Sequence, residues 1–133
     1  MAPPALCGLI LFAGFVSAQT LHIYAIDVEG GKSTLYVSPS GESMLVDTGY
    51  AGNDNRDADR IAAAAASAGV KKIDYLVVTH YHGDHACGVP QLAAKMPIGK
   101  IFDHGDNIET TTRRPRRSTN PSWRCAPSMR IRL

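Results

Sequence analysis

The chain has 133 residues, of which 44% are hydrophobic, and its net charge at neutral pH is +2. This near-neutral total conceals an uneven distribution, because residues 1–112 carry a net charge of −5 and residues 113–133 carry +7. All of the excess positive charge therefore lies in residues 113–133, whose composition differs from that of the rest of the chain. The 94 residues from Gln19 to Thr112 are enough for one small core.

The first segment of the chain predicts a signal peptide. Residues 6–16 are apolar over a length too short to span a bilayer, and Val16-Ser17-Ala18 forms a small-x-small cleavage pattern before Gln19. We therefore assign residues 1–18 to a signal peptide and expect a secreted or periplasmic protein without a stable membrane span after cleavage. The alternative is an N-terminal helix that stays buried or is retained in the membrane.

The next segment predicts an α/β unit. Short β-branched and apolar runs predict strands, and an Ala-rich run with acidic residues in its first turn predicts a helix that ends at Gly69. Pro39-Ser40-Gly41 predicts a hairpin turn. The expected order is strands at 21–28, 33–38 and 43–47, a helix at 57–68, a strand at 73–78, a helix at 90–95 and a strand at 98–102.

A cluster of metal-ligand residue types follows the strand at 73–78. His80, His82, Asp84 and His85 lie within six positions, and imidazole nitrogens and carboxylate oxygens are ligands of zinc and related ions. His80 and His82 lie on one side of the chain if the extended geometry continues. Gly83 permits a sharp turn that brings Asp84 and His85 to the same pocket. The spacing therefore predicts a metal site at the carboxyl end of a strand.

The remaining histidines and cysteines favour simpler interpretations. His22 belongs to an alternating segment, so we place it on the exposed face of the first strand. His104 follows the last predicted strand and is interpreted as a loop residue near the pocket, with a ligand role as the alternative. Cys87 is interpreted as a buried small residue; a disulfide with Cys125 and a metal-ligand role are the alternatives.

Three motifs together resemble the N-terminal half of a metallo-β-lactamase-fold hydrolase. They are Asp27-Val28-Glu29-Gly30-Gly31-Lys32, then Met44-Leu45-Val46-Asp47-Thr48-Gly49, then residues 79–85. Their spacing is similar to that of the hydrolase domain of ComEC-type DNA-uptake proteins, which carry Asp-Val-Gly-Gln-Gly-Asp at the first motif. The resemblance implies an α/β fold, the N-terminal half of an αββα sandwich in residues 19–112, in a chain that we interpret as truncated.

The resemblance also implies residue roles. His80 and His82 would ligate one divalent ion, and Asp84 and His85 a second; Asp47 would support the ligand loop through hydrogen bonds. The expected ions are zinc, with manganese or iron as alternatives. A metal-activated water or hydroxide, oriented by Asp84 as the catalytic residue, would attack an ester-type bond, with a phosphodiester as the first candidate substrate.

The family's remaining ligands are a further His, a bridging Asp and a final His downstream. After His85 this sequence offers one histidine, His104. The alternative function is therefore a truncated, non-catalytic half-domain that binds metal weakly or requires a partner chain.

The Arg-rich residues 113–133 lack helix or strand periodicity, which predicts a basic disordered tail. We interpret the abrupt change of composition as a frame shift or truncation. A patch that binds nucleic acid is the alternative, although one aromatic residue, Trp123, among seven Arg residues is a weak pattern for stacking on bases.

Overall fold

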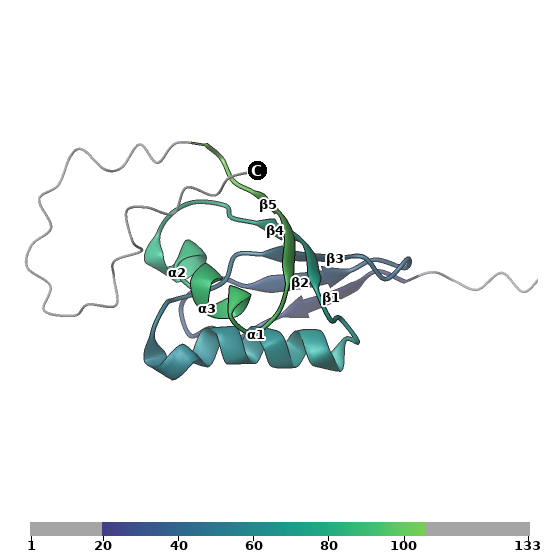
Figure 1. Cartoon of the computed structure of the whole chain (residues 1–133), viewed down its shortest axis with the longest axis horizontal. Coiled ribbons are helices and arrows are strands. Elements are labelled where there is room, and N and C mark those ends of the chain that lie inside the picture. The colour runs from purple at the N-terminus through teal and green to yellow at the C-terminus, as the bar shows by residue number, and fades with distance from the viewer. Residues whose placement is uncertain (1–19, 106–133) are drawn as a thin grey trace, which may run out of the picture.

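The computed structural model describes residues 20–105 (Figure 1). The predicted signal peptide at 1–18 and the predicted basic tail at 113–133 lie outside the described residues, as do both ends of the predicted domain at 19–112. Within the described part of the chain, no helix is long and apolar enough to cross a membrane.

The strands form one mixed sheet in the order β1-β2-β3-β4-β5 (Figure 1). β2 pairs antiparallel with both β1 and β3, whereas β4 pairs parallel with both β3 and β5. The turn between β2 and β3 is closed by the Gly41 amide, which donates to the Ser38 carbonyl over 2.9 Å. The strands are β1 His22–Ala25, β2 Thr34–Val37, β3 Ser43–Val46, β4 Ile73–Val77 and β5 Ile98–Phe102.

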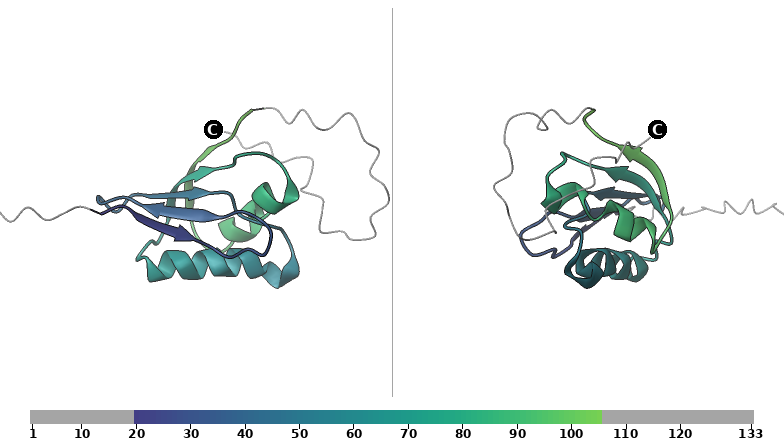
Figure 2. Two further views of the ribbon diagram at one scale, coloured as in Figure 1. Left: turned by 180° about the vertical axis from the view of Figure 1, so that it is seen from behind. Right: turned by 60° about the vertical axis from the view of Figure 1, so that its left-hand side comes forward.

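Helices make the parallel crossovers. A short left-handed turn, η1 (Asn53–Asn55), and the helix α1 (Arg56–Ser67) connect β3 to β4. Two short helices, α2 (Gly83–Ala86) and α3 (Val89–Ala93), connect β4 to β5. Figures 1 and 2 show α1 and α3 on the same side of the sheet, as parallel crossovers of one hand require.

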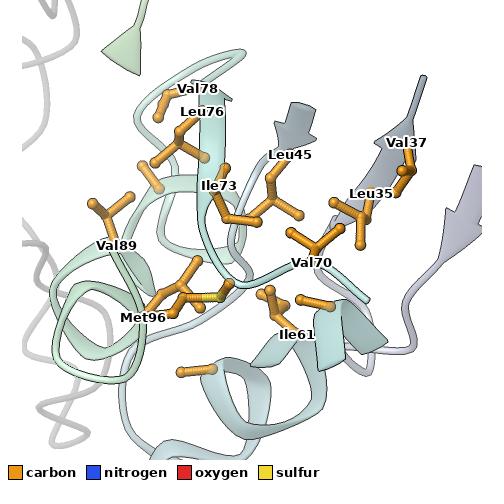
Figure 3. Packing of buried hydrophobic residues seen from close by; sticks show 14 residues of the cluster. Leu35, Val37, Leu45, Ile61, Val70, Ile73, Leu76, Val78, Val89 and Met96 are labelled. Atoms are coloured by element: carbon orange, nitrogen blue, oxygen red, sulfur yellow. The ribbon is translucent and has the colours of Figure 1, made fainter. Parts of the chain in front are cut away.

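The core lies between this side of the sheet and the helices. Leu35, Leu45 and Leu76 are paired across β2, β3 and β4, and all three are fully buried. They pack against Ile61 of α1 and Leu92 of α3 in one cluster (Figure 3). Burying such a side chain stabilises a fold by roughly 1.5–3 kcal/mol, so this layer fixes how the crossovers sit on the sheet.

The opposite face of the sheet also carries apolar residues. Tyr36, Met44 and Tyr75 are paired across β2, β3 and β4, and all three are partly exposed. At the two edges Ile23 is 60% exposed and Phe102 is 46% exposed. The described residues thus build one helix-covered face and leave an apolar face on the other side.

The predicted α/β class and element order are confirmed, with element ends that agree to within three residues. Two details differ from the sequence prediction. The first is α2, which was predicted as part of a loop. The second is Gly83, which does not make a glycine-specific turn: its φ is not positive, and a Cβ there would lie 3.6 Å from Cys87 Sγ, an ordinary contact. The chain turns because extended His82 leads directly into α2.

Candidate metal centre

The candidate ligands and Asp47 lie at the carboxyl ends of two adjacent parallel strands. Asp47 follows β3, and residues 79–85 follow β4, which pairs with β3 in parallel. The Asp47 amide extends this pairing by donating to the Val77 carbonyl over 2.9 Å. Parallel strands end at the same edge of a sheet, so two motifs that are 32 residues apart meet there.

Asp47 is a fully buried carboxylate that accepts three hydrogen bonds. The Thr79 amide donates to Oδ1 over 2.8 Å, and the Thr79 hydroxyl donates to Oδ2 over 2.8 Å. His85 Nδ1 lies 2.8 Å from Oδ2. Because a carboxylate only accepts, the proton of this pair belongs on His85 Nδ1, and Nε2 keeps its lone pair whenever the ring is neutral. This carboxylate–histidine pair is the arrangement that orients metal-binding imidazoles.

The ring of His80 contacts the rings of both His82 and His85. The centroids of His80 and His85 are 3.9 Å apart, and those of His80 and His82 are 4.6 Å apart. His80 Nε2 and His82 Nδ1 share a hydrogen bond of 3.0 Å, and the Thr79 hydroxyl lies 3.1 Å from His80 Nδ1. The structure therefore brings together the three histidines that the sequence groups.

Asp84 lies in the first turn of α2, beside the histidines. Its Oδ2 atom is 3.5 Å from His85 Nε2, and its side chain is 30% exposed. Its carbonyl accepts a hydrogen bond of 3.0 Å from the Lys32 amide. A Cβ on Gly31 would lie 2.7 Å from that carbonyl oxygen, so the loop between β1 and β2 can approach Asp84 only with glycine at this position.

The donor types suit a divalent ion, whereas the side-chain arrangement is not that of a formed metal site. Among residues 20–105, no group of three or more His, Cys, Asp or Glu side chains is arranged to hold one ion. Instead, His80 and His82 bond to each other. Neutral imidazoles and a carboxylate fit zinc and related ions by chemistry, and binding would replace this ring-to-ring hydrogen bond with bonds to the ion.

Two residues that support this edge carried no role in the sequence prediction. Thr79 binds Asp47 through both its amide and its hydroxyl. Thr48 donates to the His85 carbonyl from its amide over 2.7 Å and from its hydroxyl over 3.1 Å. Both residues lie within the sequence motifs, and this position was the signal in the sequence that could have identified them. Their partners, however, become visible only once β3 and β4 are paired.

The other predicted positions lie around this cluster. His104 is exposed in the loop after β5, with its ring centroid 4.9 Å from that of Tyr81, whose hydroxyl donates to the Gly105 carbonyl over 2.9 Å. His22 is exposed on β1, as predicted. Cys87 is buried, at 3% exposure, as predicted.

Comparison with known proteins identifies the family. The model of the metallo-beta-lactamase superfamily matches residues 26–119, a segment that includes the edge of the sheet described above. The chain belongs to the metallo-β-lactamase superfamily. This finding confirms the predicted superfamily, and the finer resemblance to ComEC-type domains stays a prediction.

Curated relatives match part of the chain. It is 36% identical over 71 residues to ribonuclease Z of Alkaliphilus oremlandii, covering 53% of this chain and 20% of that protein. A UPF0173 metal-dependent hydrolase of Staphylococcus saprophyticus is 36% identical over 63 residues, covering 47% and 24%. An atrochrysone carboxyl ACP thioesterase of a Cryptosporiopsis species is 32% identical over 76 residues, covering 56% and 23%.

The matched segment thus spans about a fifth to a quarter of the length of these relatives. No solved structure matches the chain.

Proposed function

We propose that this protein is a metal-dependent hydrolase whose metal ligands include His80, His82, Asp84 and His85. The observation that carries the proposal is the hydrogen bond from His85 Nδ1 to the buried Asp47 carboxylate, beside two further histidine rings. This bond leaves Nε2 as the ligating nitrogen of His85. Membership of the superfamily, and a relative that is named as a metal-dependent hydrolase, support the same function.

The proposed cofactor is a pair of divalent ions, zinc first, with manganese or iron as alternatives. Bound ions would supply Lewis acidity to polarise an ester-type group and to activate water. The chain's own residues would orient and move protons. Asp47 holds the tautomer of His85, and the Asp84 carboxylate, 3.5 Å from His85 Nε2, is the group that we assign to accept the proton of the attacking water.

The proposed reaction is hydrolysis of an ester-type bond, with a phosphodiester as the first candidate. Two relatives are named for such chemistry, one as a ribonuclease and the other as a thioesterase. A small-molecule phosphodiester is the first substrate to test, and nucleic acid is a further candidate. The resemblance of the motifs to those of ComEC-type DNA-uptake proteins also favours a phosphodiester, with nucleic acid as one possible substrate.

A second candidate function is weak metal binding without catalysis, with the remaining ligands supplied by a partner chain. The described side chains favour this candidate, because no three His, Cys, Asp or Glu side chains among them are arranged to hold one ion. The two candidates differ in metal stoichiometry and in turnover, so one set of measurements separates them.

The test uses the 133-residue chain with measured zinc content and with bis(p-nitrophenyl) phosphate as substrate. We expect two tightly bound ions and metal-dependent hydrolysis, and we expect the double variant H80A/H82A to abolish metal uptake. His22→Ala is the control, because His22 lies on β1 and should leave the metal content unchanged. Weak binding without turnover supports the second candidate, whereas unchanged metal content in the double variant contradicts the ligand assignment.

We also propose that the protein is exported, as the pattern of residues 1–18 predicts. Expression of the full chain in a bacterial host followed by fractionation tests this localisation. The proposal requires a secreted or periplasmic product that begins near Gln19. An uncleaved cytoplasmic product contradicts it.

A further inference from the structure

A second buried carboxylate, Asp57, lies beneath the turn that follows Asp47. Its side chain is 1% exposed, and its Oδ2 atom accepts a hydrogen bond of 2.8 Å from the Tyr50 amide. A Cβ on Gly49 would lie 2.5 Å from the same oxygen, so the turn rests directly on this carboxylate. Asp57 is one of two acidic residues in the first turn of α1, which in the sequence indicated only the start of a helix.

The segment that Asp57 supports adopts strained backbone conformations. Asp47 has a φ of 61°, and three consecutive residues before α1, Asn53, Asp54 and Asn55, have φ values of 46°, 52° and 64°. Left-handed conformations are unfavourable for non-glycine residues and persist where the surrounding contacts hold them. The Asp47 turn therefore needs fixed partners on both sides, and Asp57 is one of them.

Arg56 neutralises Asp57 and links it to another loop. Its Nε donates to Asp57 Oδ1 over 2.7 Å, and its Nη1 donates to Glu29 in the loop between β1 and β2. The hydrogen bond to Asp57 is the main reason that the pKa of Arg56 is raised above its usual value. A buried carboxylate is tolerated when it is paired and hydrogen-bonded in this way.

The loop between β1 and β2 returns to the proposed ligands. The Lys32 amide donates to the Asp84 carbonyl over 3.0 Å, and the Gly49 amide donates to the Lys32 carbonyl over 3.1 Å. Arg60 of α1 also binds this loop through Glu29, over 3.1 Å. Asp57 and Arg56 thus contact the two segments that hold Asp47 and Asp84 in place.

We propose that Asp57, paired with Arg56, is a positioning residue that fixes the Asp47 turn and through it the orientation of His85. Asp57 acts through the turn and does not touch the ligand cluster. The inference rests on the proposed metal function for its significance, but the positioning itself is a property of the backbone and is measurable without metal.

The experiment compares Asp57→Asn with Asp74→Asn in the full chain. Asp74 is a matched control because it also accepts a backbone hydrogen bond, 3.0 Å from the Ser43 amide, at the other end of the sheet. The first readout is amide hydrogen exchange without metal at Thr48 and Thr79, whose amides bind the His85 carbonyl and Asp47. The second is the affinity for Co²⁺, followed by visible absorption.

We expect Asp57→Asn to speed exchange at Thr48 and Thr79 about tenfold. We also expect it to weaken Co²⁺ binding by about 10- to 100-fold, the range typical of residues that orient ligands. Asp74→Asn should speed exchange at Ser43 and leave Co²⁺ binding unchanged. Wild-type exchange and affinity in Asp57→Asn, or an equal loss of affinity in Asp74→Asn, would overturn the inference.

Arg56→Lys keeps the test decisive if Asp57→Asn does not fold. Lysine keeps the charge but lacks the planar guanidinium that donates to both Asp57 and Glu29. We therefore expect smaller changes than in Asp57→Asn, again toward faster exchange and weaker Co²⁺ binding. No change in either readout would overturn the inference. If the wild-type chain binds no Co²⁺, the proposed function fails, and the exchange rates alone decide the positioning role.

Discussion

At the scale of single residues, the site depends on one carboxylate more than on any other group. Asp47 sits in a left-handed conformation at the end of β3 and joins Thr79 and His85 by three hydrogen bonds. Because Asp47 is fully buried, water cannot replace the hydrogen bonds that a substitution of this carboxylate would remove. Its hydrogen bond to His85 determines which ring nitrogen carries the proton.

We therefore predict that Asp47→Asn weakens zinc binding by about 10- to 100-fold. An asparagine amide can donate to His85 Nδ1, which moves the ring proton to Nε2 and removes the lone pair needed for a metal. Competition with a chromophoric chelator measures the affinity. Asp27→Asn, at a carboxylate that is 79% exposed, is the control. Equal affinities of the wild type and Asp47→Asn would refute the role of this pair.

At the scale of elements, the parallel pair of β3 and β4 is fixed at both ends by a carboxylate. Asp47 closes the end that carries the ligands, and Asp74 closes the other by accepting from the Ser43 amide and hydroxyl, each over 3.0 Å. These two hydrogen bonds are the main causes that lower the pKa of Asp74. The register that places Asp47 beside Thr79 is thus specified from both directions.

The lowered pKa of Asp74 predicts that the stability of the fold depends on pH. A carboxyl whose folded pKa is lowered stabilises the fold fully above the unfolded pKa of about 3.9, and the contribution is lost as the pH falls through the lower folded pKa. The difference in free energy of unfolding between the wild type and Asp74→Asn should stay constant at pH 5–7 and shrink below about pH 4. Urea unfolding across this range measures it, and a difference that does not change with pH would contradict the assignment.

At the scale of the whole molecule, the sequence predicted the order of elements along the chain and the grouped histidines because both depend on local patterns. His80, His82, Asp84 and His85 are near neighbours in the chain, and the strand before them sets their common edge. Asp47 was predicted from the family resemblance of its motif. Its three hydrogen bonds, which come from Thr79 and His85, could be identified only from the fold.

The parts that the sequence did not predict depend on contacts between distant segments. Arg56 and Glu29 are 27 residues apart, and their bond exists only because α1 begins under the loop between β1 and β2. Gly88 has a similar origin, since a Cβ there would lie 2.1 Å from the Thr48 carbonyl oxygen, a contact that no local pattern encodes. Gly83, which looked like the necessary glycine, has room for a side chain.

The described residues form a scaffold for the site and leave one face of the sheet without a covering helix. The helices cover the face that carries Leu45 and Leu76, and the other face presents Tyr36, Met44 and Tyr75. The candidate ligands lie at the edge between these faces, at the ends of β3 and β4. The site therefore stands on paired strands and short hydrogen-bonded turns, which suits the precise placement of ligands.

The central claim, that the clustered histidines bind a divalent ion, is tested most directly by NMR of the ring nitrogens in the ¹⁵N-labelled chain during a zinc titration. Single His→Gln variants assign the NMR signals of the five histidines, so the response of each ring to zinc can be followed separately. We predict that the ring-nitrogen signals of His80, His82 and His85 shift together, with zinc at Nε2 of His85, while the signals of His22 do not move. Zinc shifts that are absent from these three rings, or that are equal at His22, would contradict it.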